Sequence, residues 1–280
     1  MRNNQRNIFA VLLILWSCAI GGNVLAQTAP YKMWYDKPAQ FWEEALPIGN
    51  GRISAMVYGD PYTGRFQLNE ETVSAGSPYQ NYNKEGKAAL SQIRKLIFER
   101  KYEKAQELGG EKLLSQVGNE MKYQTVGSLN IRYKNRKEVT GYYRELDIDH
   151  AVTTTRYKVD GVEFTEEAFA SLTDQLIIIH IQSSVAKMID CELFFSTPMK
   201  NPTYSIPGKR NLRLEGTTEG TNFVPGKVHY CADLKLKNKG GNVSANDTLL
   251  SVKGATELTL YISMATNLSL IHISEPTRQA

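Results

Sequence analysis

The chain has 280 residues, of which 41% are hydrophobic and 22% are charged, and its formal net charge is +4. These values are ordinary for a globular protein, and the length allows one large or two modest domains with a substantial core. The small positive charge does not indicate a concentrated basic surface. We therefore expect no nucleic-acid partner.

Residues 1–26 have the pattern of an export signal. Arg2 and Arg6 precede an apolar run from Ile8 to Ile20, and small residues end the segment at Ala26. This pattern predicts cleavage before residue 27 and a periplasmic or secreted protein. The apolar run is too short for a stable membrane span.

Three cysteines leave two questions open. Cys18 follows Ser17, which allows a lipoprotein anchor, but the bulky Trp16 and the apolar residues after Cys18 favour simple cleavage of the signal. Removal of the signal leaves Cys191 and Cys231. In an oxidising compartment they could form a disulfide, and otherwise each is a buried free thiol.

The first elements of the mature chain are a short aromatic strand at residues 31–35 and a β-hairpin within residues 46–76. Ile53, Ala55 and Val57 alternate with Ser54, Met56 and Tyr58, which is the period of a strand. The turn follows at residues 60–64, because proline presets φ and glycine permits positive φ. A second alternating run then covers residues 65–72. An antiparallel fold of the two runs places the loop 49–52 beside residues 71–77.

This end of the hairpin is the candidate functional region. It gathers five polar residues, namely Asn50, Arg52, Asn69, Glu70 and Glu71. Adjacent carboxylates point to opposite faces of a strand, so Glu70 and Glu71 cannot act together as a catalytic acid and base. Gly49-Asn50-Gly51 begins like a dinucleotide-binding motif, but Ser54 occupies the place of the third glycine and a strand follows. A polar edge that meets another domain or a sugar is the better interpretation.

The rest of the chain is a short helical region followed by many strands. Residues 83–100 carry apolar residues at helical spacing, and a second helix begins at Tyr102 and weakens at Gly109-Gly110. Residues 240–247 are predicted as a polar loop. The strands are predicted at 128–133, 142–148, 151–159, 162–170, 175–182, 190–196, 211–217, 227–236, 248–253 and 257–265. Together they predict a mainly β fold, a large antiparallel sandwich with a short helical insertion.

The sequence offers no motif for a metal or a cofactor. Its four histidines, His150, His180, His229 and His272, lack the spacing of metal ligands. It contains no G-x-S-x-G elbow and no Walker loop. We therefore expect no metal site and no cofactor.

Several separated motifs resemble the N-terminal domain of glycoside hydrolase family 95, whose members include α-L-fucosidases and α-L-galactosidases. The resemblance covers residues 31–267. It is carried by WYDKPA at 34–39, WEEALPIGNGR at 42–52 and QLNEET at 67–72, and further by residues 93–98, 123–129, 143–149 and 169–171. Ser74 departs from the pattern, because the family usually has tryptophan there.

The resemblance implies a β-super-sandwich at residues 27–268, followed in the intact enzyme by an (α/α)6 catalytic barrel. It also implies that the enzyme hydrolyses terminal α-L-fucosyl or α-L-galactosyl residues of fucosylated glycans by inversion. The catalytic residues of the family belong to the barrel, so no catalytic residue is assigned in this chain. Residues 269–280 resemble translated adapter sequence, and we expect a truncated fragment that is inactive by itself.

Two other functions remain open from the residues alone. The chain could be a stand-alone carbohydrate-binding β-sandwich, because its N-terminal third is rich in aromatic rings that can stack on sugars. These rings belong to Tyr31, Trp34, Tyr35, Trp42, Tyr79 and Tyr82. It could also be a non-catalytic envelope scaffold protein.

Overall fold

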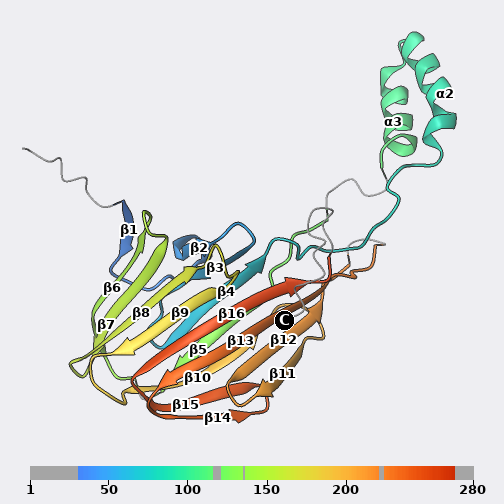
Figure 1. The fold of residues 1–280 in the computed structure, drawn as a ribbon. Coiled ribbons are helices and arrows are strands. Elements are labelled where there is room, and N and C mark those ends of the chain that lie inside the picture. Colours follow the sequence, from blue (N-terminus) through green and yellow to red (C-terminus); the bar gives the residue numbers. More distant parts are fainter. Residues whose placement is uncertain (1–30, 116–120, 135, 221–223, 269–280) are drawn as a thin grey trace, which may run out of the picture.

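The computed structural model describes residues 31–115, 121–134, 136–220 and 224–268. Their strands form two antiparallel sheets of nine and seven strands that lie face to face (Figure 1). The predicted mainly β fold, a large antiparallel sandwich with a short helical insertion, is confirmed. The predicted export signal 1–26, Cys18 and the tail 269–280 lie outside the described residues.

The larger sheet has the strand order β1-β6-β7-β8-β9-β16-β13-β12-β11. These strands are β1 (Lys32–Tyr35), β6 (Val139–Asp147), β7 (Val152–Val159), β8 (Val162–Ala170), β9 (Ile177–Ser183), β16 (Glu257–Thr266), β13 (His229–Lys239), β12 (Asn211–Thr217) and β11 (Thr203–Gly208). The sheet therefore places β16, the last strand of the described residues, between β9 and β13.

The smaller sheet has the order β14-β15-β10-β5-β4-β3-β2. These strands are β14 (Asn242–Asn246), β15 (Leu249–Ala255), β10 (Ile189–Ser196), β5 (Gly127–Tyr133), β4 (Thr63–Glu70), β3 (Ile53–Val57) and β2 (Leu46–Gly49). A short 3-10 helix, η1 (Trp42–Glu44), precedes β2. Two α-helices, α2 (Gly86–Phe98) and α3 (Tyr102–Lys112), lie between β4 and β5 in the chain.

The core lies between the sheets and follows from the period-2 alternation of the strands. In β16, Leu258, Leu260 and Ile262 are at most 1% exposed, whereas the residues between them are half-buried. Ile179 of β9 and Leu193 of β10 belong to the same continuous cluster and are fully buried. Each sheet thus contributes one apolar face to a single core.

Besides Glu70, two charged side chains are buried in the described part of the sandwich. Arg144 of β6 is 1% exposed, and its guanidinium donates hydrogen bonds to the carbonyl oxygens of Lys37 (2.8 Å) and Glu44 (2.8 Å), which anchors the segment before β2. Glu166 of β8 is 7% exposed and accepts a hydrogen bond from the Tyr133 hydroxyl at 3.2 Å. Burial raises the pKa of the Glu166 carboxyl to about 7.

Three strands that the sequence did not predict all lie at sheet edges. β2 and β14 are the two ends of the smaller sheet, and β11 is one end of the larger sheet. The segment 242–246, predicted within a polar loop, is β14, and none of its residues is buried. Edge strands need no alternating apolar face and tolerate proline, as at Pro47 and Pro207. β11 and β14 have no buried residue and therefore give little hydrophobic period, whereas β2 buries Leu46 and Ile48 but is only four residues long.

The two cysteines of the described chain belong to different sheets and are free thiols. Cys191 of β10 is 1% exposed and lies in the core. Cys231 of β13 is half-buried between the inward-facing Tyr230 and Ala232, so it lies on the opposite, outer face of its own sheet. The larger sheet therefore lies between the two thiols.

The helical insertion forms an arm that projects from one end of the sandwich (Figure 1). We call α2 and α3 the helical arm, and residues 72–76 with 121–126 its stem. α3 continues through Gly109-Gly110 to Lys112, beyond the predicted weakening. Neither helix of the described chain is long and apolar enough to cross a membrane.

Candidate functional site

The predicted hairpin between β3 and β4 is confirmed, and its register builds the site. Ile53 pairs with Glu70, and Val57 pairs with Phe66. At the far end, the Asp60 carboxylate accepts hydrogen bonds from the backbone N–H groups of Tyr62 (2.7 Å) and Thr63 (2.9 Å), which fixes the turn. As a result, the loop 49–52 lies beside the end of β4, as the sequence predicts.

Asn50 shapes this loop and ties it to the opposite sheet. Its side-chain carbonyl accepts hydrogen bonds from the backbone N–H groups of Arg52 (3.1 Å) and Ile53 (2.9 Å). Its amide nitrogen donates to the carbonyl oxygen of Ser171 at 2.7 Å, in the turn between β8 and β9. A single amide thus both holds the loop and bridges the two sheets.

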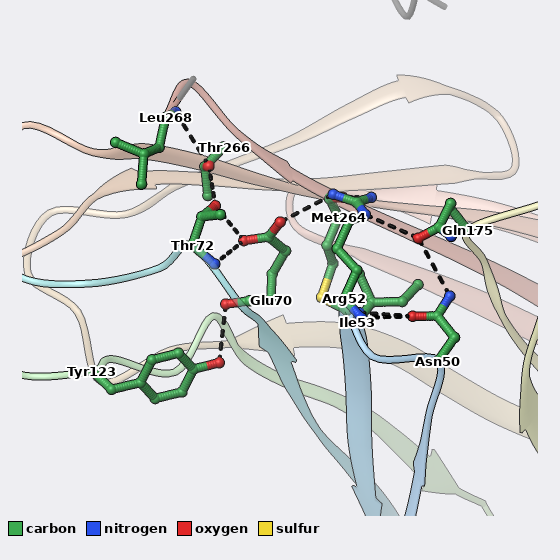
Figure 2. Close-up of polar contacts among 10 residues, drawn as sticks. All are labelled: Asn50, Arg52, Ile53, Glu70, Thr72, Tyr123, Gln175, Met264, Thr266 and Leu268. Atoms are coloured by element: carbon green, nitrogen blue, oxygen red, sulfur yellow. Dashed lines mark hydrogen bonds and ion pairs between the residues drawn. The ribbon is translucent and has the colours of Figure 1, made fainter. Parts of the chain in front are cut away.

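Arg52 uses all three guanidinium nitrogens within the sandwich (Figure 2). Nη1 lies 3.0 Å from Oε1 of Glu70, Nε donates to Oε1 of Gln175 at 3.0 Å, and Nη2 donates to the carbonyl oxygen of Met264 at 2.9 Å. The Arg52 side chain is 25% exposed and that of Glu70 is 2% exposed. The ion pair is therefore largely shielded from water and links the smaller sheet to β16 of the larger sheet.

The second oxygen of Glu70 holds the residue at which the stem begins. Oε2 accepts hydrogen bonds from the backbone N–H (2.7 Å) and the hydroxyl (2.6 Å) of Thr72. The Thr72 hydroxyl also contacts the Thr266 hydroxyl of β16. We call Asn50, Arg52, Glu70, Thr72, Gln175 and Thr266 the polar cluster. The buried carboxylate is thus paired on both oxygens.

Tyr123 connects the returning half of the stem to the same point. Its hydroxyl donates a hydrogen bond to the carbonyl oxygen of Glu70 at 3.0 Å, and its backbone forms an isolated bridge with Ser74. Partial burial, then the charges of Glu70 and Glu71, raise the pKa of this hydroxyl, so it remains a donor at neutral pH.

Of the five predicted site residues, the structure brings three together. Asn50, Arg52 and Glu70 meet in the polar cluster. Asn69 pairs in register with Ser54 and is half-buried, and alternation places its side chain on the other face of the sheet. Glu71 is exposed, and its backbone N–H donates to the carbonyl oxygen of Arg52 at 2.9 Å. Glu71 lies in the turn after β4, whereas Glu70 is the last residue of the strand and is buried.

Sequence reasoning missed the partners that come from distant strands. Gln175 and Ser171 lie in a turn more than a hundred residues away, and Met264 contributes a backbone carbonyl, which leaves no trace in a sequence. Thr72 follows Glu70 closely and was detectable as a hydroxyl that could hydrogen-bond the carboxylate.

The polar cluster borders an open pocket through Thr266. This pocket of about 910 Å³ lies at the ends of β11, β12, β13 and β16, and it is also lined by Lys200, Thr217, Glu219, His229 and Tyr230. Within the described residues, no group of three or more His, Cys, Asp or Glu side chains could hold a metal ion. The pocket extends the polar surface at this end of the sandwich.

The sequence matches a protein-family model over residues 33–269, and that model is described as "Glycosyl hydrolase family 65, N-terminal domain". The chain belongs to this family. The motifs resemble glycoside hydrolase family 95, whereas the matching model is described as family 65. Membership of family 95 stays a prediction.

Curated relatives of this glycosyl hydrolase N-terminal domain are named as fucosidases. Alpha-L-fucosidase 2 of Arabidopsis thaliana is 32% identical over 191 residues, which are 67% of this chain and 22% of the relative. Probable alpha-fucosidase A of Aspergillus niger is 29% identical over 60% of this chain and 22% of the relative. This chain therefore spans about a fifth of the length of the curated relatives that it matches.

A solved structure from the human microbiome, described as a kojibiose phosphorylase, matches 86% of this chain and 33% of its own, with 10% identity and a TM-score of 0.45.

The polar cluster contains one carboxylate, that of Glu70. Hydrolysis of a glycosidic bond uses two carboxyl groups that flank the substrate. In this domain Glu70 is buried with both oxygens occupied, and Glu71, the next residue, is exposed and lies beyond the end of β4. The polar cluster therefore joins the two sheets and the stem.

Proposed function

We propose that this chain is the N-terminal domain of an exported family 95 glycoside hydrolase that removes terminal α-L-fucosyl, or α-L-galactosyl, residues with inversion. The observation that carries the proposal is the family match together with relatives named as fucosidases. The motifs at residues 34–39, 42–52 and 67–72, which resemble family 95, support the finer assignment.

In this proposal the catalytic residues belong to an (α/α)6 barrel of the same polypeptide, and the sandwich alone is inactive. The loop containing Asn50 and Arg52, together with residues 69–76, braces the barrel near the mouth of its active site. The guanidinium of Arg52 donates its hydrogen bonds inside the sandwich, so Arg52 acts by holding the loop and the stem in shape.

The test compares this chain with the complete enzyme, in which the catalytic remainder follows the sandwich. Both are assayed for fucose release from a nitrophenyl α-L-fucoside and from a fucosylated oligosaccharide, and proton NMR identifies the first anomer formed. We expect no release by the chain alone and β-L-fucose from the complete enzyme. Fucose release by the chain alone, or retention of configuration, would contradict the proposal.

The bracing role has its own test. In the complete enzyme, Arg52→Met should lower kcat/KM at a temperature where the variant remains folded. Kinetics and stability equal to those of the parent enzyme would count against a bracing role.

Export is tested at the N-terminus of the mature protein. We propose that processing removes residues 1–26, so protein recovered from the periplasm or medium should begin at Gln27. A lipid-modified N-terminus at Cys18 would instead support the lipoprotein alternative.

A second candidate, a carbohydrate-binding sandwich, is favoured by one exposed aromatic pair. Trp34 of β1 is 57% exposed and stacks with Tyr143 of β6, with ring centroids 6.1 Å apart. Lys32 and Glu145 hydrogen-bond each other and the Tyr143 hydroxyl, so donors and acceptors lie beside the rings. Titration calorimetry of the chain with fucosylated glycans tests this candidate, with Trp34→Ala as the comparison. The absence of heat would dismiss it.

A further inference from the structure

The helical arm has little intrinsic stability. α2 has 13 residues and α3 has 11, and the residue before each helix makes no side-chain capping hydrogen bond. Isolated helices shorter than about 12–15 residues are marginal in water. Gly109 and Gly110 weaken α3 further, since a glycine costs about 1 kcal/mol relative to alanine in a helix. The arm therefore needs packing to remain folded.

The sandwich does not supply this packing. Within the described chain the helices pack mainly against each other, and both project away from the strands (Figure 1). The buried residues of the two helices are Gly86, Ile93 and Ala105. Small residues account for two of these three, so the arm by itself buries little apolar surface.

The arm instead presents apolar side chains to the outside. Phe98 is 86% exposed, Tyr102 62%, Ile97 46% and Leu90 36%. Leu90 and Ile97 are seven residues apart on α2 and share one side of it, and Phe98 lies near the joint between the helices. We call these four residues the arm face. Lys87 and Arg94 fall on the same side of α2 by helical spacing, so the arm face carries two basic groups.

The stem is nevertheless held in a defined direction. Its two halves pair through backbone hydrogen bonds from Ala75 N–H to the carbonyl of Lys122 (2.8 Å) and from Gln124 N–H to the carbonyl of Val73 (2.9 Å). Gly76 exchanges backbone hydrogen bonds with the segment after β12, at 3.1 Å and 3.0 Å. Thr72, at the root of the stem, is bound by Glu70 of the polar cluster. The sandwich thus aims an arm that it does not cover.

We propose that the arm face docks onto the catalytic remainder of the same polypeptide. This inference rests on the proposed function, in which that remainder follows the sandwich. The matched family is an N-terminal domain and the curated relatives are four to five times as long as the matching segment, which is 22% of each. In the proposed enzyme the remainder is therefore a large partner that is covalently joined to the domain carrying the arm. The chemistry of the arm face predicts an apolar groove with an acidic rim on that partner.

The first test uses this chain alone and hydrogen exchange measured by mass spectrometry. Amides of α2 and α3 should exchange at least about 100-fold faster than those of the central strands β5 and β13, because the uncovered arm opens locally. An arm as well protected as these strands in the monomer would overturn the proposal. So would a dimer of this chain that is lost in Phe98→Glu, since the occupant would then be a second copy.

The second test uses the complete enzyme. The same helical amides should gain at least about 100-fold protection relative to the chain alone. Phe98→Glu should remove most of this gain, whereas Gln92→Glu should retain it within about twofold, because Gln92 lies on the opposite side of α2 and the added charge is the same. Equal behaviour of the two variants would overturn the proposal.

Hydrogen exchange and fucose release together distinguish a failure of docking from a failure of the proposed activity. An enzyme that releases fucose but leaves the arm unprotected refutes docking and leaves the function standing. A protected, Phe98-dependent arm in a polypeptide that does not release fucose supports docking and refutes the assigned activity.

Discussion

Replacing Arg52 by methionine should destabilise the isolated sandwich much more than an equivalent change at an exposed ion pair. Arg52→Met leaves the Glu70 carboxylate, 2% exposed, without its cationic partner, and it leaves acceptors on Gln175 and Met264 without a donor. Removing one partner of a buried pair costs about 3–5 kcal/mol, and each lost neutral hydrogen bond adds about 1 kcal/mol.

Two features reduce this sum. The Arg52 side chain is 25% exposed, so water reaches part of the vacated site, and Glu70 retains both hydrogen bonds from Thr72. We therefore expect the free energy of unfolding to fall by about 3 kcal/mol. Urea unfolding followed by far-UV circular dichroism measures this change in the chain as it stands.

The matched control is Arg213→Met. Arg213 also forms a bidentate pair, with Asp233 at 2.7 Å and 2.8 Å, but the two side chains are 39% and 37% exposed. An exposed pair contributes at most about 1 kcal/mol. If the two substitutions lower the free energy of unfolding equally, the polar cluster does not lock the sheets. Within a Glu70→Gln background, the cost of Arg52→Met should shrink by about 1–2 kcal/mol, since neighbouring partners are coupled.

Three other predictions follow from buried groups. Burial raises the pKa of Glu166 in the folded state from 4.5 to about 7, so the folded state binds this proton more tightly than the unfolded state. The free energy of unfolding should therefore fall by about 3 kcal/mol as pH rises from 4.5 through 7. Urea titrations at pH 5 and pH 8 measure this loss, and Glu166→Gln should remove it. Gly59→Ala should lower the free energy of unfolding by about 2–3 kcal/mol, because φ is +69° and the added Cβ would lie 2.8 Å from the Tyr142 hydroxyl. The control is Gly161→Ala, where φ is +78° and the added Cβ meets no atom within 4 Å, so the cost should be about 1 kcal/mol. Equal shifts of the thermal denaturation midpoint in the two variants would refute this reasoning. Burial raises the pKa of Cys191 to about 12 and that of Cys231 to about 11. Both thiols should therefore react with an aromatic disulfide reagent at least about 10-fold more slowly in the native protein than in urea. A mass spectrum that shows a disulfide between them would contradict the fold.

The sequence predicts the interior of this fold better than its margins. Strands with one apolar face, such as β10 and β16, are recognised by period-2 alternation, because burial against the other sheet selects apolar residues at every second position. β2, β11 and β14 lie at sheet edges and each pairs with one neighbouring strand. β11 and β14 bury no residue, and β2, which buries Leu46 and Ile48, is too short for a clear period.

The candidate site divides in the same way. The meeting of Arg52 with Glu70 follows from hairpin register, which is local, and the sequence predicts it. The contacts to Gln175, Met264 and Thr266 depend on how the second sheet lies over the first, which no local pattern encodes. Glu166 stands in phase with the buried Phe164 and Ala168 of β8, so alternation places it inward, but its hydrogen bond from Tyr133 depends on how the two sheets pack.

The position of the helical insertion gives the polar cluster a mechanical role. β4 and β5 are neighbouring antiparallel strands, so a short turn would suffice to join them, yet the chain leaves β4 at Glu70 and returns to β5 only after the arm. Glu70 fixes the root of the outgoing half through Thr72, and Tyr123 fixes the returning half through the Glu70 carbonyl. Because Arg52 ties Glu70 to β16, the root of the arm is joined to both sheets. A buried ion pair at the root of an arm is therefore better explained by orientation of that arm than by the stability of the sandwich alone.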